Sequence, residues 1–305
     1  DTDGTHKDLT PEEGARSLFY QWSEDKSAFF YGSNKRDSRF MDLYKMDLES
    51  LDSDLVYQND DGYDVGVVSP DEKYVALSKS INTNDSDLFM YNLESDELKK
   101  INKSQSGNSP QDFAPDGSAL YYTTDDGSEF SYLMKYTIAD ESYEKTLERD
   151  WDISGSYFTQ NGTYQVTYIN EDAKNTIEVM EVAAGGNIDL PTVENMEITS
   201  VSFSDDESMM RFYAGGSHTP SNLYVYDLNT KEQKKLTDVL NPEIQGQDLV
   251  KAEVIRYKSF DGLEIPAIYY TPHQASEASP VPALVWVHGG PGGQSRQNFS
   301  SFIQY

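Results

Sequence analysis

The stretch SPDEKYVALS, residues 69–78, decides the fold because four other stretches of the chain repeat its pattern. They are SEDKSAFFYG (23–32), APDGSALYYT (114–123), TQNGTYQVTY (159–168) and SDDESMMRFY (204–213). The third residue of each is Asp25, Asp71, Asp116, Asn161 or Asp206, so the successive spacings are 46, 45, 45 and 45 residues. A fixed period of this length indicates a repeat architecture.

A second β-like run follows each of these stretches. The runs are MDLYKMDL (41–48), SDLFMYNL (86–93), SYLMKYTI (131–138), NTIEVMEV (175–182) and SNLYVYDL (221–228). A short polar turn and a further brief run, such as ELKKIN (97–102), come next. Four strands in about 45 residues are typical of a β-propeller blade. The sequence therefore predicts a mainly β protein with five complete four-stranded blades.

The repeated acidic or amide residue has two interpretations, a metal ligand or a turn residue. Asp and Asn side chains hydrogen-bond their own backbone in tight turns, which favours the second. Two other segments, Asp1-Thr2-Asp3-Gly4 and Asp125-Asp126-Gly127, faintly resemble calcium loops but lack the alternating oxygen ligands and the closing Glu. We predict no metal site and no cofactor.

Composition excludes several classes of function. The 305 residues include 53 acidic and 24 basic side chains, for a net charge of −29, and such a surface repels phosphate backbones and anionic lipid. We therefore expect neither a nucleic-acid nor a membrane partner. The absence of cysteine excludes disulfides and thiolate metal sites. Oligomeric state is left open, as is the compartment, whether cytoplasmic or periplasmic and secreted.

The periodicity ends near residue 240, which predicts a propeller over 1–240, a linker over 241–251 and the beginning of another domain over 252–305. Residues 252–272 predict a hairpin turning at Asp261-Gly262. The apolar run ALVWV (283–287) is suited to a buried central strand, and residues 295–305 to the start of a helix. We expect the chain to be a fragment. Its first ten residues match the tail of the last repeat (226–237), which indicates further blades before Asp1, and the second domain is incomplete.

The loop HGGPGGQ (288–294) has four interpretations. A dinucleotide loop needs a third glycine where Ser295 stands, and a phosphate loop needs a lysine before Ser or Thr. A flexible strand-to-helix turn is the third, and an oxyanion-hole loop the fourth. The chemistry favours the last, because backbone N–H groups stabilise the charge that grows on an attacked carbonyl, each by about 3–4 kcal/mol. Gly290 is the preferred donor and Gly289 supports the loop, while His288 orients it.

The segments YKSFDGLEIPAIYYTP (257–272) and VPALVWVHGGPGGQS (281–295) resemble the entry into the catalytic domain of prolyl oligopeptidase family serine peptidases, nearest the acylaminoacyl-peptidase and dipeptidyl-peptidase-like branch. The Ser/Ala-Pro-Asp-Gly turns likewise resemble propellers of the TolB-like and prolyl oligopeptidase-like kind. The resemblance implies a propeller that limits access to an α/β-hydrolase domain, an oligopeptide substrate, and an oxyanion donor at the second glycine of His-Gly-Gly, which is Gly290.

The chain also departs from that pattern. No Gly-x-Ser-x-Gly nucleophile elbow occurs in it, so the Ser-Asp-His triad is absent and we expect these 305 residues alone to be inert. His6, His218 and His273 lie in the propeller or the linking loop and are poor triad candidates. Glu12-Glu13 invites comparison with the paired glutamates of dipeptidyl peptidases, but acids near a turn are the better interpretation. Two alternatives stay open: a propeller-containing esterase, and a propeller binding or scaffold protein with a degenerate hydrolase appendage.

Overall fold

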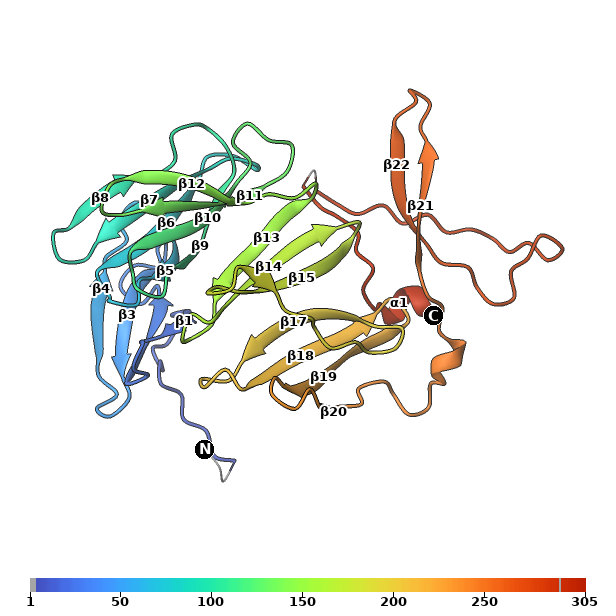
Figure 1. The fold of residues 1–305 in the computed structure, drawn as a ribbon, viewed down its shortest axis with the longest axis horizontal. Coiled ribbons are helices and arrows are strands. Elements are labelled where there is room, and N and C mark those ends of the chain that lie inside the picture. The colour runs from blue at the N-terminus through green and yellow to red at the C-terminus, as the bar shows by residue number, and fades with distance from the viewer. Residues whose placement is uncertain (1–3, 291) are drawn as a thin grey trace. The chain divides into compact units, whose positions relative to one another are not determined.

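The computed structural model describes residues 4–290 and 292–305, and their regular structure is almost entirely β-strand (Figure 1). Within these residues, twenty strands form five four-stranded sheets, and strands that are consecutive in sequence are neighbours in each sheet. We call the sheets blades 1 to 5. The prediction of five four-stranded propeller blades is confirmed.

The strands have the following bounds. Blade 1 contains β1 (Ser17–Trp22), β2 (Ala28–Ser33), β3 (Asp42–Asp47) and β4 (Ser53–Tyr57). Blade 2 contains β5 (Asp64–Val68), β6 (Tyr74–Ser80), β7 (Ser86–Asn92) and β8 (Glu97–Lys100). Blade 3 contains β9 (Asn108–Phe113), β10 (Ala119–Thr124), β11 (Tyr132–Thr137) and β12 (Ser142–Leu147). Blade 4 contains β13 (Asp152–Phe158), β14 (Tyr164–Glu171), β15 (Lys174–Glu181) and β16 (Gly186–Asn187). Blade 5 contains β17 (Glu197–Phe203), β18 (Met209–Gly216), β19 (Thr219–Asp227) and β20 (Gln233–Lys235).

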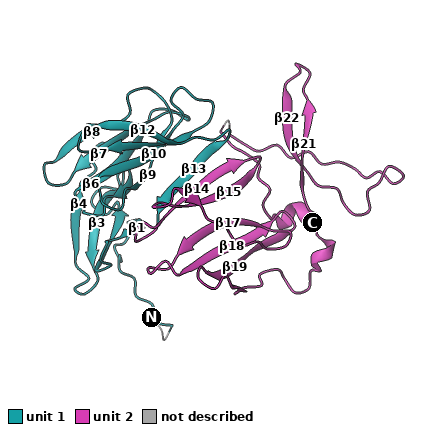
Figure 2. Ribbon diagram, in the orientation of Figure 1, with its two compact units in different colours: residues 1–158 teal, residues 159–305 magenta. Residues whose placement is uncertain are grey.

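The chain divides into two compact units, Asp1–Phe158 and Thr159–Tyr305 (Figure 2). Unit 1 contains blades 1 to 3 and β13. Unit 2 contains the remaining strands of blade 4, blade 5 and the segment that follows it.

The repeated Asp forms the turn between the first two strands of a blade. In blade 1, Asp25 Oδ1 accepts hydrogen bonds from Ser23 Oγ at 2.8 Å and from the Ser27 N–H at 3.0 Å. The next residue of every such turn has a left-handed backbone: Lys26 (φ 56°), Glu72 (58°), Gly117 (71°), Gly162 (69°) and Glu207 (54°). The prediction of turn chemistry is confirmed at the four aspartates, whereas the Asn161 side chain donates to the Asp205 carbonyl of the corresponding turn in blade 5, at 2.8 Å. Of the faint calcium-loop segments, Asp1–Asp3 lie outside the described residues.

Alternation along β6 shows how a blade is buried on both faces. Val75 and Leu77 are fully buried in a cluster with Phe30 of blade 1. Ala76, which points to the opposite face, packs in a second cluster with Leu120 of blade 3. One strand therefore supplies apolar side chains to two cores, which is why these runs are almost continuously apolar.

Side chains on the first strands tie neighbouring blades of unit 1 together. Gln21 on β1 donates from its amide to the Val68 carbonyl at 3.0 Å and accepts from the Val68 N–H at 2.8 Å. Asp112 on β9 accepts from the Phe158 N–H of β13 at 2.7 Å and from the Phe113 N–H at 2.8 Å. These bonds satisfy backbone groups that no neighbouring strand of the same sheet reaches.

A buried ion pair closes the loop between β2 and β3. The Asp42 side chain is fully buried, and its two oxygens accept from the Arg36 guanidinium at 2.7 and 2.8 Å. The Asn59 N–H also donates to Asp42, at 2.8 Å. The carboxylate is therefore compensated by a bidentate partner and a backbone donor.

Arg36→Met is expected to lower the free energy of unfolding of unit 1 by about 3 kcal/mol, because it leaves the buried Asp42 carboxylate without its cation. Urea unfolding followed by fluorescence measures the change. Arg39→Met is the matched control, since Arg39 is largely exposed and pairs with Asp37 at the surface; it should shift the free energy by no more than about 0.5 kcal/mol. Equal losses in the two variants would contradict this account of Asp42.

After blade 5 the chain forms η1 (Gly246–Asp248), the hairpin of β21 (Glu253–Lys258) and β22 (Glu264–Tyr269), and α1 (Ser301–Gln304). The hairpin turns at Gly262, whose φ is +88°, so this prediction is confirmed. The helix start predicted over 295–305 is confirmed only for Ser301–Gln304, since residues 295–300 are not helical. The prediction of a buried strand over 283–287 is wrong: the segment is in no strand, and Leu284 and Val285 are 83% and 82% exposed. A central strand needs hydrogen-bonded neighbours, and the described residues supply none for it. No helix among the described residues is long and apolar enough to span a membrane.

Candidate functional site

The backbone of the glycine loop explains two of its glycines. Gly290 has φ +72°, a left-handed conformation that costs a residue with a side chain about 1–2 kcal/mol. The Gly293 N–H approaches the Gly290 carbonyl at 3.5 Å, which closes a tight turn. A Cβ on Gly293 would collide with the Gly289 carbonyl oxygen. The left-handed φ therefore favours glycine at 290, and the close approach of the Gly289 carbonyl requires glycine at 293.

The three residues that we singled out in the sequence lie together and are exposed. The N–H groups of Gly289 and Gly290 donate no hydrogen bond to any residue that the structure describes. Apart from the adjacent residues, no atom of the described chain lies within 4 Å of the position that a Cβ would take on either glycine. His288 Nδ1 lies 3.5 Å from the Gly289 carbonyl, inside the loop. Two adjacent backbone donors are thus available to an external acceptor.

The chain just beyond the loop is attached to the β14–β15 hairpin of blade 4. The Gln297 N–H donates to the Ala173 carbonyl at 2.9 Å, and Asn170 Nδ2 donates to the Gln294 side chain at 3.0 Å. The Arg296 guanidinium donates to Asn175 Oδ1. The two central residues of this hairpin turn, Asp172 and Ala173, both have positive φ, 49° and 66°, as is common in two-residue hairpin turns. We call residues 170–175 the anchoring turn.

Further contacts attach the chain from residue 250 onward to blades 4 and 5. Arg256 of β21 forms an ion pair with Asp172 of the anchoring turn at 2.6 Å. The Gln304 side chain of α1 donates to the Ser217 and Val250 carbonyls, both at 2.8 Å. The Ser217 hydroxyl also accepts from the Ala252 N–H at 2.8 Å. The segment from 250 onward is therefore held at two blade hairpins, β14–β15 and β18–β19.

The other sequence candidates lie outside this site. His218 sits beside Ser217 in the β18–β19 turn, and burial together with nearby Lys251 lowers its pKa below the ordinary value. Its Nδ1 is buried without a hydrogen-bond partner among the described residues. Glu12 forms an ion pair with Lys35 at 3.4 Å, which accounts for one of the two adjacent glutamates as a surface charge.

Sequence reasoning missed the anchoring turn. Its contacts with Gln294 and Arg296 join residues more than 120 positions apart, and residues 170–175 carry no motif beyond an ordinary hairpin turn. The only available signal was the polar run Gln294 to Gln297, whose amide and guanidinium groups are suited to binding exposed carbonyls.

The sequence model of one known family, described as "Prolyl oligopeptidase, N-terminal beta-propeller domain", matches residues 4–239. The chain belongs to this family. The match extends over all five blades that the structure describes.

One curated protein and two solved structures are similar to this chain. Dipeptidyl aminopeptidase BIII of Pseudoxanthomonas mexicana is 23% identical over 99% of this chain and 45% of its own length. A structure from a study of two prolyl endopeptidases matches 94% of this chain and 44% of its own with a TM-score of 0.72 at 15% identity. Prolyl oligopeptidase B of Galerina marginata, solved bound to a 35mer substrate, matches 82% of this chain and 38% of its own chain. The TM-score is 0.62 and the sequence identity is 18%.

The chain thus spans less than half the length of these relatives. At this level of identity the solved structures show a common fold. The curated relative is a peptidase by its name, and prolyl oligopeptidase B was solved with a peptide substrate.

Proposed function

We propose that this chain is part of a serine peptidase that hydrolyses oligopeptides through an acyl-enzyme. In this proposal residues 1–240 are the propeller, which limits substrate access, residues 241–251 are a linker, and residues 252–305 begin an α/β-hydrolase domain. Membership of the prolyl oligopeptidase propeller family supports the class of enzyme. The nucleophile, the acid and the base are not among these residues.

The observation that carries the proposal is the free backbone of Gly290. When a serine attacks a peptide carbonyl, the carbonyl oxygen becomes an oxyanion, and a donor about 3 Å away stabilises it. The Gly290 N–H has no partner among the described residues, and the space beside its Cα is open. These observations support an N–H that is free to donate to a peptide carbonyl. Gly289 supplies the adjacent backbone, and His288 orients the loop.

The anchoring turn supports a role for the propeller beyond that of a filter. An oxyanion donor is effective only when its position is fixed before the reaction. The Gln297 N–H bonds to the Ala173 carbonyl only seven residues from Gly290, and Arg296 and Gln294 bond to the same turn. Blade 4 thus restrains the chain immediately after the loop.

The experiment uses the product of the whole gene that encodes this chain. We expect a fluorophosphonate, which modifies activated serines, to label one serine outside residues 1–305 and to abolish hydrolysis of a fluorogenic dipeptide amide. Replacing the labelled serine by alanine should abolish both. The isolated 305-residue chain is the control and should remain unlabelled.

The other outcomes separate the alternatives. Hydrolysis of a p-nitrophenyl ester without hydrolysis of the peptide amide would replace the peptidase by an esterase. A full-length product without labelling or hydrolysis of either compound would overturn the enzyme proposal and leave a propeller that binds or scaffolds.

A further inference from the structure

The turn between β13 and β14 contains the only Asn-Gly pair in the sequence, Asn161-Gly162. The corresponding turns of the four other blades contain an aspartate, whose carboxylate accepts hydrogen bonds within its own turn. A carboxylate only accepts hydrogen bonds, whereas the amide of an asparagine also donates them. Asn161 therefore gives its turn a contact that an aspartate cannot make.

That contact joins blade 4 to the corresponding turn of blade 5. Asn161 Nδ2 donates to the Asp205 carbonyl at 2.8 Å, and the Asn161 backbone N–H donates to Glu207 Oε1 at 2.8 Å. We call these two hydrogen bonds the inter-blade contact. Both lie within unit 2. The first of them exists only as long as residue 161 carries an amide.

The Asn-Gly pair is also a reactive sequence. Glycine has no side chain to hinder its backbone nitrogen, so this nitrogen can attack the amide carbon of a preceding asparagine. The Gly162 nitrogen gives its proton to a base in the solvent and forms a bond to Asn161 Cγ. The Cγ–Nδ2 bond breaks, and ammonia leaves after taking a proton from water. Water then opens the cyclic imide at either carbonyl, which leaves aspartate or isoaspartate at position 161.

The folded turn opposes this reaction at both reacting groups. The Gly162 N–H donates to the Thr159 carbonyl at 2.8 Å, and this bond holds the proton that the nitrogen must lose. The Asp205 carbonyl holds the amide nitrogen that must leave. Asn161 is nevertheless exposed, so water and base reach it when the turn opens locally. Opening of the inter-blade contact should therefore control the rate.

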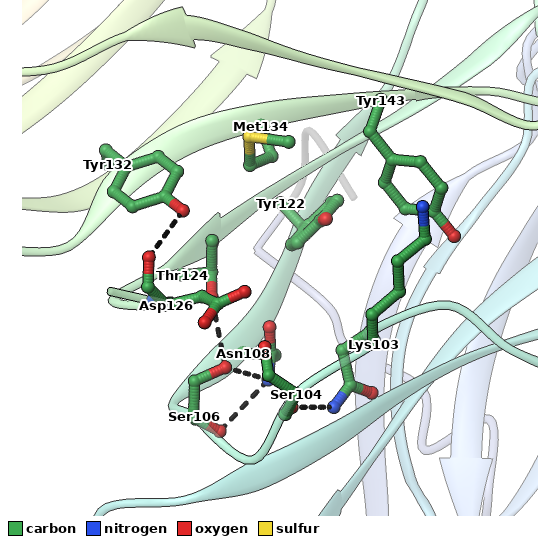
Figure 3. A pocket seen from close by; sticks show the side chains of 11 residues that line it. Lys103, Ser104, Ser106, Asn108, Tyr122, Thr124, Asp126, Tyr132, Met134 and Tyr143 are labelled. Atoms are coloured by element: carbon green, nitrogen blue, oxygen red, sulfur yellow. Dashed lines mark hydrogen bonds between the residues drawn. The ribbon is translucent and has the colours of Figure 1, made fainter. Parts of the chain in front are cut away.

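Asn108 provides a comparison within the same chain. It precedes Ser109, whose side chain hinders attack by the backbone nitrogen, and it is only 4% exposed. Its amide donates to the Ser86 carbonyl at 2.8 Å and to the Ser106 carbonyl at 3.0 Å. Figure 3 shows this amide bonded to Ser106 within its loop. Asn108 should therefore remain intact in the native chain.

We propose that Asn161 is a deamidation site whose conversion detaches the turn of blade 4 from blade 5. The new carboxylate cannot donate to the Asp205 carbonyl. It also places a negative charge close to Glu207, which accepts from the backbone of residue 161. The turn itself tolerates the change, because an aspartate occupies this position in the four other blades. Deamidation thus preserves the blade and removes its side-chain bond to the next one.

The reaction is measured on the 305-residue chain at pH 8 and 37 °C, either native or unfolded in guanidinium chloride. Peptide mapping by mass spectrometry follows each asparagine. We expect a mass increase of about one dalton at Asn161 in both states, at least tenfold more slowly in the native chain. Asn108 should remain unchanged in the native chain over the same time.

Two glutamate variants test the control by the inter-blade contact. Glu207→Ala removes the acceptor of the Asn161 N–H and should accelerate deamidation of the native chain. Glu72→Ala is the matched control, because Glu72 has the same turn position and left-handed backbone in blade 2 but pairs with Lys45. It should leave the rate at Asn161 unchanged.

Asn161→Asp reproduces one product of the reaction and tests its consequence. Hydrogen–deuterium exchange of residues 204–208 in blade 5 should become about fivefold faster, the factor that corresponds to the loss of one hydrogen bond. Asn229→Asp adds the same charge at an exposed position of blade 5 and should exchange as the parent does.

Four results would overturn the proposal. The native chain could stay unmodified at Asn161, or it could be modified there as fast as the unfolded chain. Glu207→Ala could deamidate no faster than Glu72→Ala. Asn161→Asp could leave the exchange of residues 204–208 unchanged. None of these measurements depends on peptidase activity.

Discussion

Gly290→Ala, introduced into the product of the whole gene, is expected to lower kcat/KM for a fluorogenic peptide by about 10²–10³-fold, the loss typical of removing one oxyanion donor. The backbone at 290 has φ +72°, and an alanine relaxes toward negative φ. That rotation turns the N–H away from the oxyanion.

Gly262→Ala is a matched control for this substitution. Gly262 has φ +88° at the tip of the β21–β22 hairpin, and open space surrounds it as it does Gly290. Both variants carry the same kind of backbone strain and should lose a similar, small amount of thermal stability. Only Gly290→Ala should lose activity. Retention of full activity by Gly290→Ala would show that this N–H is not an oxyanion donor.

Asp112→Asn is expected to remove a large pH-dependent part of the stability of unit 1. The residue as a whole is half-buried, but burial of its carboxyl group raises the pKa of Asp112 from the ordinary 3.8 to about 7. The hydrogen bonds from the Phe158 and Phe113 N–H groups lower this pKa, but burial has the larger effect. Between these values the folded chain keeps a proton that the unfolded chain loses. Its contribution to stability is therefore fully present below about pH 4 and is lost as the pH rises to about 7.

The measurement is the free energy of unfolding in urea at several pH values from 4.5 to 8. Relative to Asp112→Asn, the parent should lose stability by roughly 1.4 kcal/mol per pH unit up to about pH 7 and none above it. Asp116→Asn is the control in the same blade, because hydrogen bonds from Ser118 lower the pKa of Asp116. The difference in free energy of unfolding between the parent and Asp116→Asn should not fall with pH in this way. Parallel curves for the parent and Asp112→Asn would contradict the raised pKa.

The blades could be predicted from the sequence because each repeat specifies its own turn. Asp25 and Asp71 accept hydrogen bonds from residues within two positions, so the signal is local and recurs every 45 or 46 residues. The β21–β22 hairpin could be predicted for the same reason, because Asp261-Gly262 is a local turn signal. The prediction of a strand over 283–287 failed because apolar character indicates burial only when other elements cover the segment. No described strand pairs with it, and the Phe302 ring of α1 contacts Trp286 but leaves it 66% exposed.

The candidate site could be predicted in part. A glycine run after an apolar stretch indicates backbone that a ligand approaches, and Gly290 has the left-handed φ that such a turn requires. The anchoring turn could not be found in this way, because an exposed Asn or Gln has the same appearance in sequence whether or not it binds a distant carbonyl.

The exposed run Ala283–Val287 also affects how this chain behaves at high concentration. It is uncharged and rich in β-branched and aromatic residues, and Val285, Trp286 and Val287 are all at least 66% exposed. Such a segment offers unpaired backbone groups and apolar side chains to an identical segment of another molecule. The very property that suits it to the interior of a sheet makes it a nucleus for aggregation when uncovered. The net charge of −29 opposes this self-association by mutual repulsion, and added salt screens that repulsion.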